Sequence, residues 1–81
     1  MKNQFAINLR LYRRERNLSL GQLAELTGVS KSILGFYENG VRQPCLPNLL
    51  ILKDFFRISL DELCIEPYYG APAYRYMDEI E

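Results

Sequence analysis

The sequence predicts an all-α fold, a compact bundle of five helices, on three observations. Apolar side chains recur at the three- and four-residue spacing of amphipathic helices. Glycines at Gly28 and Gly40 stand where two such segments end. Serines precede three segments as N-caps: Ser19, Ser30 and Ser59. With 81 residues, 48% of them apolar, the chain suffices for one small domain with a modest core.

The first helix is expected over residues 4–16. Ile7 and Leu11 lie one turn apart outside its apolar stripe, and an exposed pair of this kind indicates a contact surface. Asn17 should end the helix. The stripe itself, at helical spacing, consists of Phe5, Leu9, Tyr12 and the stem of Arg16.

Two short helices, 20–27 and 31–38, are joined by Gly28-Val29-Ser30. Ser19 and Gln22 form a capping box at the start of the first, and Ser30 caps the second. Leu34 and Tyr37 define the inner side of the second helix. Two helices joined so closely have the layout of a helix-turn-helix, whose second helix can enter the DNA major groove.

The fourth helix should begin after Cys45, which is a poor N-cap because sulfur accepts hydrogen bonds weakly. Pro47 suits its first turn. Ser59 and Glu62 form a second capping box at the start of a short fifth helix. The apolar face expected for the fourth helix consists of Leu46, Leu49, Leu50, Leu52 and Phe56.

Residues 65–81 form an acidic extension that contains four of the six tyrosines. Pro67 and Pro72 prevent a helix from continuing through its first part. Three interpretations stay open: the extension packs on a neighbouring subunit, it folds back on the first helix, or it is a loose terminus.

Charge is distributed unevenly although the chain has no net charge. Residues 1–58 carry +5 and residues 59–81 carry −5. A basic body is the electrostatic footprint that a DNA-binding protein needs, although +5 can also be an ordinary solvated surface.

Several classes of protein are excluded. The chain has no histidine, and Cys45 and Cys64 lack the spacing of a zinc site; we expect free, buried or half-buried thiols. No nucleophile–base arrangement or phosphate loop is present, so we expect neither an enzyme nor a cofactor. Apolar runs are too short to cross a bilayer and no signal peptide opens the chain, so the cytoplasm is expected and a membrane partner is not.

The chain from Phe5 to Cys64 resembles the phage repressor and Cro-type (XRE-like) helix-turn-helix DNA-binding family. The stretches that carry the resemblance are Leu9…Tyr12-Arg13…Leu18-Ser19…Leu23-Ala24…Gly28-Val29-Ser30…Tyr37-Glu38-Asn39-Gly40…Pro44…Ile58-Ser59-Leu60-Asp61-Glu62-Leu63. The resemblance implies a lambda-repressor-like DNA-binding domain over residues 1–64, with residues 65–81 as a dimer contact or loose tail. It implies a transcription regulator, a repressor that binds a palindromic operator in double-stranded DNA as a homodimer. The alternative is a protein-interaction module of the same fold, antitoxin-like or a partner of another regulator, with weak or no DNA binding.

The resemblance also implies roles for individual residues. An ion pair between Arg13 and Glu38 would be structural, because an unpaired Glu38 would repel phosphate. Leu20 replaces a glutamine that often contacts a phosphate in relatives, and Gly35 and Phe36 replace polar side chains, so Phe36 could read DNA or bind a protein. Base contacts are expected from Lys31, Ser32, Ile33 and Phe36. Phosphate contacts are expected from Arg10, Ser19, Asn39, Arg42 and Gln43.

Overall fold

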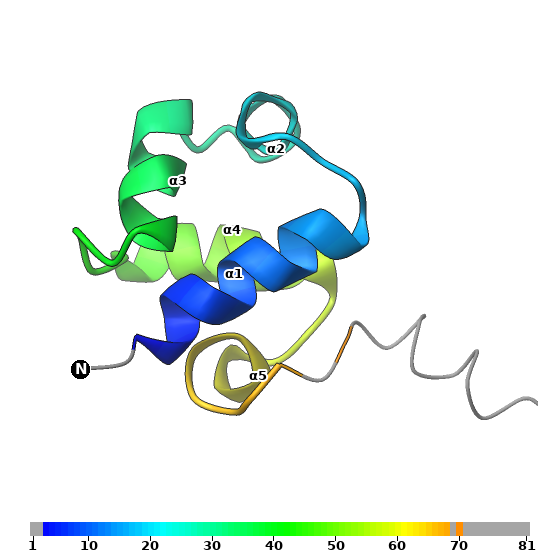
Figure 1. Ribbon diagram of the computed structural model, residues 1–81, viewed down its shortest axis with the longest axis vertical. Coiled ribbons are helices and arrows are strands. Elements are labelled where there is room, and N and C mark those ends of the chain that lie inside the picture. Colours follow the sequence, from blue (N-terminus) through cyan, green and yellow to red (C-terminus); the bar gives the residue numbers. More distant parts are fainter. Residues whose placement is uncertain (1–2, 69, 71–81) are drawn as a thin grey trace, which may run out of the picture.

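Residues 3–68 and residue 70 are described by this computed structural model, and they form five helices and no strand. The helices are α1 (Gln4–Glu15), α2 (Leu20–Thr27), α3 (Lys31–Glu38), α4 (Leu46–Phe56) and α5 (Leu60–Cys64). In Figure 1, α1 crosses the middle of the molecule, with α2 and α3 above or beside it and α5 below. The contacts between elements agree with this view, since α1 packs against both α3 and α5, and α4 packs against α2 and α5. The predicted all-α fold is confirmed.

The predicted helix ends are confirmed to within one residue. The Ser19 hydroxyl accepts from the backbone N–H of Gln22 at 3.0 Å, and Gln22 Oε1 accepts from the backbone N–H of Ser19 at 2.8 Å. Ser59 and Glu62 form the same box before α5, and Ser30 caps α3. Cys45 makes no side-chain cap. Helix α1 ends at Glu15 rather than residue 16, because the chain turns at once into a left-handed residue, Asn17, with φ of 57°.

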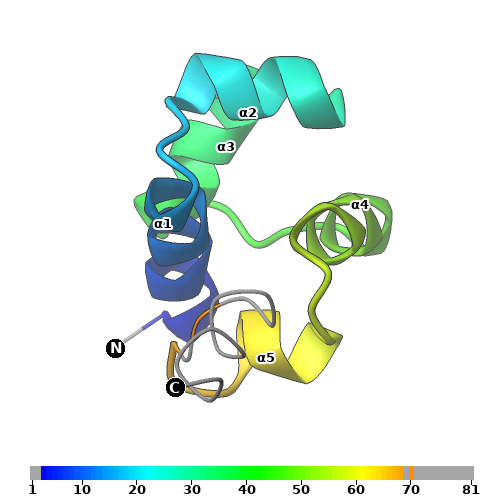
Figure 2. The ribbon, with the colours of Figure 1, turned by 90° about the vertical axis from the view of Figure 1, so that its right-hand side faces the viewer.

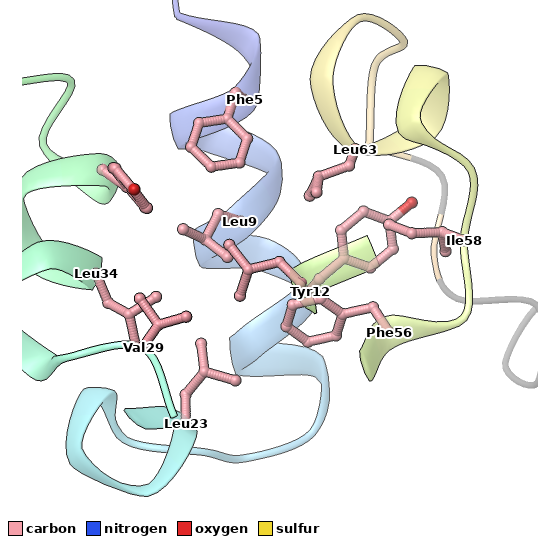
Figure 3. Close-up of a cluster of buried hydrophobic side chains, with 11 residues drawn as sticks. Phe5, Leu9, Tyr12, Leu23, Val29, Leu34, Phe56, Ile58 and Leu63 are labelled. Atoms are coloured by element: carbon pink, nitrogen blue, oxygen red, sulfur yellow. The ribbon is translucent and has the colours of Figure 1, made fainter. Parts of the chain in front are cut away.

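The core lies where α1 meets the α2–α3 pair, α4 and α5 (Figure 3). Leu9 and Tyr12 of α1 and Leu34 of α3 have no exposed surface, and Tyr37 is 3% exposed. Val29, between α2 and α3, enters the same cluster. The predicted inner stripes of α1 and α3 are therefore confirmed. The remaining members of the core come from α2, α4, α5 and the connection before α5: Leu23, Leu52, Phe56, Ile58 and Leu63.

The prediction for α4 was too broad. Leu52 and Phe56 are buried and Leu49 is half-buried, but Leu46 is 60% exposed and Leu50 is 40% exposed. Residues 49, 52, 55 and 56 pack against the core and Asn48 donates to Tyr37, whereas residues 46 and 50 fall to one side of this face.

Two further surface predictions need correction, the one for Cys45 and the one for the pair Ile7 and Leu11, whereas the prediction for Cys64 is confirmed. Cys45 is a free thiol as predicted, but it is exposed, because it precedes the first turn of α4. Cys64 is free and half-buried, and burial, together with nearby Asp61, raises the pKa of its thiol. Ile7 and Leu11 are half-buried rather than exposed. None of the described helices combines the length and apolar character needed to cross a bilayer.

Asn8 is a buried polar residue that the sequence patterns did not reveal. It has no exposed surface, and its Nδ2 donates to the carbonyls of Glu62 and Leu63 at 3.1 Å and of Glu66 at 2.7 Å. Its Oδ1 accepts from Gln4 Nε2 at 2.9 Å. The last carbonyls of a helix have no partner within that helix. Asn8, on the neighbouring helix α1, supplies hydrogen-bond donors to these carbonyls at the end of α5.

The beginning of the C-terminal extension folds back on α1. The Tyr68 ring contacts the Tyr12 ring edge-on at 5.0 Å between centroids, and its hydroxyl donates to Glu15. Gly70 is buried. The folded body therefore continues beyond Cys64, while residues 69 and 71–81, including most of the predicted dimer contact or tail, lie outside the described residues.

We predict that Asn8→Ala lowers the free energy of unfolding by about 1–3 kcal/mol, the cost of leaving buried polar groups without partners. Denaturant unfolding of the purified chain measures this. Arg14→Ala, at an exposed position on the same helix, should change it by no more than about 0.5 kcal/mol. Equal stability of the two variants would contradict the assigned role of Asn8.

Candidate nucleic-acid interface

Helices α2 and α3 form a rigid helix-turn-helix. Gly28 adopts a left-handed conformation with φ of 81° and ends α2, while its N–H donates to the Ala24 carbonyl at 2.8 Å. Val29 is 5% exposed and anchors the turn in the core. Figure 2 shows α2 lying across one end of the molecule with α3 beneath it, opposite α5. The turn therefore fixes the angle between the two helices through one left-handed glycine and one buried side chain.

The structure brings three of the four predicted base-contacting side chains to the outer face of α3, defined here as Lys31, Ser32, Gly35 and Phe36. Lys31 and Ser32 are exposed in the first turn, and Phe36 is 38% exposed one turn later. Ile33 is half-buried and packs against the core, at the edge of this face. The first three are thus accessible to a partner, and Ile33 is accessible in part.

Phe36 and Arg42 form a contact that sequence reasoning missed. The Arg42 guanidinium carbon lies 5.1 Å from the centre of the Phe36 ring, a cation–π arrangement. The backbone supports it, because the Val41 N–H donates to the Phe36 carbonyl at 2.9 Å and folds the loop back over α3. No local rule predicts this pair, since it depends on the path of the loop through Asn39 and Gly40. Phe36, a predicted base contact, and Arg42, a predicted phosphate contact, therefore lie against each other.

The predicted phosphate-contacting side chains lie in one loop, at one helix start and, for Arg10, on α1. Asn39, Arg42 and Gln43 are exposed after α3, and Ser19 is exposed before α2. The Ser19 hydroxyl uses an acceptor lone pair for its cap, so its proton can still be donated to a phosphate. The sequence did not predict Gln22 as a phosphate contact, although its amide lies at the same helix start and its Nε2 carries two donors. The capping box places Gln22 at this helix start and was the signal that could have added it.

Arg13 and Glu38 are joined by two hydrogen bonds, Nε to Oε2 at 2.7 Å and Nη2 to Oε1 at 3.0 Å. Arg13 Nη1 also donates to the Leu18 carbonyl at 2.6 Å. The side chains are 12% and 5% exposed, so water screens the pair little. The hydrogen bond to Glu38 is the main cause of a raised pKa of Arg13, partly offset by burial, and the guanidinium stays charged.

Arg10 contacts the Arg13–Glu38 pair and is also partly exposed at the surface. Its Nε lies 3.7 Å from Glu38 Oε1, and its side chain is 43% exposed. The Glu38 carboxylate is therefore turned into the molecule and neutralised by two guanidinium groups. As a result, α3 carries a buried negative charge at its end without presenting it to a partner.

The arrangement suits binding of a polyanion. Within the part of the chain that the structure describes, no group of three potential metal ligands comes together. Exposed side chains that donate hydrogen bonds surround α3 and the start of α2, and the latter adds the partial positive charge of a helix N-terminus.

A family model described as "Helix-turn-helix" matches residues 9–63. Among curated proteins, the control protein C.SmaI of Serratia marcescens is 36% identical over 63 residues, 78% of this chain and 75% of that protein. The transcriptional regulator AnsR of Bacillus subtilis is 43% identical over 51 residues, 63% of this chain. The chain covers only 44% of the length of AnsR.

A solved structure shows the same similarity in three dimensions. The restriction-modification controller protein C.AhdI of Aeromonas hydrophila is 37% identical, with a TM-score of 0.68, over 74% of this chain and 91% of that protein. The family model itself spans residues 9–63, from α1 to α5.

We predict that Glu38→Gln destabilises the protein by about 3–5 kcal/mol, the usual cost of removing one partner of a buried ion pair. The change leaves the Arg13 charge buried without its carboxylate. Thermal and denaturant unfolding measure the loss. Glu25→Gln, at an exposed position on α2, is the matched control and should be nearly neutral; if both variants unfold alike, the pair does not hold α1 to α3.

Proposed function

The chain belongs to the helix-turn-helix family, and on that premise we propose that it is a sequence-specific regulator of transcription that binds double-stranded DNA through α3 in the major groove. The observation that carries the proposal is the outer face of α3, which presents Lys31 and Ser32 at the start of a helix held rigidly by the core. Regulators among the relatives support it.

Base readout is assigned to the outer face of α3. The Lys31 ammonium can donate to guanine O6 or N7, and the Ser32 hydroxyl can donate or accept. Phe36, with Ile33 at its side, offers an apolar surface to a thymine methyl group. Because only one charged side chain lies on this face, we expect few hydrogen bonds to bases and a large share of apolar contact.

Affinity is assigned to phosphate contacts on both sides of α3. Arg42 is positioned for such a contact by its stacking on Phe36, and Asn39 and Gln43 lie in the same loop. Ser19 and the first N–H groups of α2 would bind a phosphate on the other side. Arg10, held partly by Glu38, would add a more distant charge.

We further propose that the protein acts as a homodimeric repressor on a palindromic operator, in the cytoplasm and without enzymatic activity. A two-fold dimer places two copies of α3 about 34 Å apart, one turn of B-DNA, so that each reads one half-site. The exposed apolar side chains of α4, Leu46, Leu50 and Ile51, supply a surface for the dimer. Lys53 and Asp54 pair with each other at 3.0 Å, so two copies of α4 can meet without a net repulsion.

The second candidate is a protein-interaction module of the same fold with weak or no DNA binding. The same exposed face of α4 favours it, since large apolar side chains at a surface are typical of interfaces. The two candidates differ in what the outer face of α3 does, and DNA titration separates them.

We predict that the protein selects a defined duplex from a random pool and that its affinity falls steeply with salt, because phosphate contacts release counterions. Arg42→Gln should weaken binding to all sequences and reduce the slope of log affinity against log salt by about 1. Lys31→Met should instead cost about 1–3 kcal/mol on the selected duplex and relax the preference at one base pair.

The matched control is Arg57→Gln, at the end of α4 next to α5, which should leave slope and preference unchanged. Fluorescence anisotropy at two salt concentrations measures all four proteins. An absence of sequence selectivity at either concentration would remove the regulator proposal and favour the interaction module.

We predict that Leu46→Asp converts the dimer to a monomer, because it places a charge in the apolar face of α4. The change should not unfold the helix, since position 46 is its first residue, where an acidic side chain is favourable. Molar mass by light scattering at fixed concentration measures the effect. The control is Val41→Asp, in the loop, where Val41 is 67% exposed; this variant should remain dimeric. If Leu46→Asp is still a dimer, the dimer contact does not lie on α4. Deletion of residues 71–81 then tests whether the extension makes it.

A further inference from the structure

Two of the five glycines have no structural reason to be glycine. Gly28, Gly40 and Gly70 have positive φ values of 81°, 73° and 93°, which other residues adopt only with strain. Gly21 and Gly35 lie inside α2 and α3 with ordinary helical backbone. A glycine in a helix makes that helix less stable than alanine does, so its presence at these two positions has a cost.

The space beside Gly35 is open. A Cβ added to it would meet one atom outside its own helix and chain neighbours within 4 Å, Leu20 Cδ1 at 3.9 Å. That distance is ordinary van der Waals contact, so the fold would accept alanine. Neither steric crowding nor backbone conformation within the described protein therefore explains the glycine.

Gly35 lies in the middle of the outer face of α3. It is one turn after Lys31, three residues after Ser32, and next to Phe36. Because glycine has no side chain, nothing projects from α3 between these residues, and we call this open surface the Gly35 notch: the surface of Gly35 together with Leu20 Cδ1. Leu20 is half-buried and packs against the core, so this wall is held in place.

The chemistry of the notch is apolar. Gly35 brings no side-chain donor or acceptor, its carbonyl already accepts from the Asn39 N–H at 3.0 Å, and the facing wall is a methyl group. The amino or carbonyl edge of a base would lose its water there without a partner, which is costly. The 5-methyl group of thymine is the one apolar group that a base pair shows in the major groove.

We propose that the Gly35 notch receives the 5-methyl group of one thymine in each half-site, which makes Gly35 and Leu20 specificity-determining residues. This inference rests on the proposed DNA binding by α3. Glycine permits the close approach of the helix backbone to the base, and Leu20 completes the contact. An alanine at position 35 would fill the notch and hold the methyl group away.

The test uses the full chain and the duplex that it selects from a random pool, with each thymine replaced singly by uracil, which removes only the methyl group. We expect one thymine per half-site at which uracil weakens the wild-type protein about fourfold, the value of one buried methyl group. In Gly35→Ala, the affinities for thymine and uracil at that position should become equal. The same variant should unfold about 4 °C higher, because alanine favours the helix.

Gly21→Ala is the matched control, since an added Cβ there meets only Ser19 Oγ at 3.9 Å. It should raise the unfolding temperature in the same way. Because Gly21 lies at the start of α2, the control is read from the ratio of the affinities for thymine and uracil, which should stay fourfold. Thymines read by Phe36 should keep their preference in both variants.

The outcomes separate the two proposals. If the wild-type protein selects a duplex but no thymine is sensitive to uracil, or if Gly35→Ala keeps the full preference, the notch is overturned and DNA binding stands. If the wild-type protein selects no sequence at all, the proposed function fails, and the notch fails with it.

Discussion

The Arg13 guanidinium connects the three parts of the chain that must keep a fixed relation. It extends from α1, donates to the Leu18 carbonyl just before α2, and binds Glu38 in the last position of α3 through two hydrogen bonds. A planar fork of donors can hold a carboxylate and a carbonyl at once in one geometry. The start of α2 and the end of α3 are thus fixed to the same side chain, and the core then only has to fill the space between them.

The same contact determines how charge is presented. Glu38 would stand on a helix that we propose to face phosphates, yet its side chain is 5% exposed and two arginines surround it. The surface near α3 and its loop therefore keeps Lys31 and Arg42 as its charges, with Arg42 stacked on Phe36. A chain with no net charge can in this way carry a basic surface near α3, because Glu38 is buried and six of the ten acidic residues lie beyond residue 58.

Local signals in the sequence predicted the helices and their caps because each cap depends on residues three apart. Ser19 with Gln22 and Ser59 with Glu62 illustrate this. The interactions that the sequence did not reveal join distant segments: Asn8 reaches carbonyls 54 to 58 residues away, and no periodicity marks an asparagine that faces inward. Leu46 and Leu50 were wrongly predicted to face the core for a related reason, because the sequence of a helix does not show whether another element covers its apolar side chains. The residues of the candidate site were predicted from their positions in the helix-turn-helix motif. The stacking of Arg42 on Phe36 could not be predicted, because it depends on the path of the loop after α3. The DNA contacts assigned to these residues are proposals.

The separation between the two sides of α3 has a consequence for how such a protein can change over time. Leu34, Tyr37 and Glu38 hold the helix to the rest of the molecule; Tyr37, for instance, accepts a hydrogen bond from Asn48 of α4 at 2.9 Å. Apart from the Phe36–Arg42 stack, the side chains on the outer face make none of these supporting contacts. Substitutions there and in the core lie on opposite sides of one helix, so their effects on stability should add independently. A small domain with a narrow margin of stability can therefore exchange its outer side chains one at a time, and new binding preferences can arise by drift without passing through unfolded intermediates.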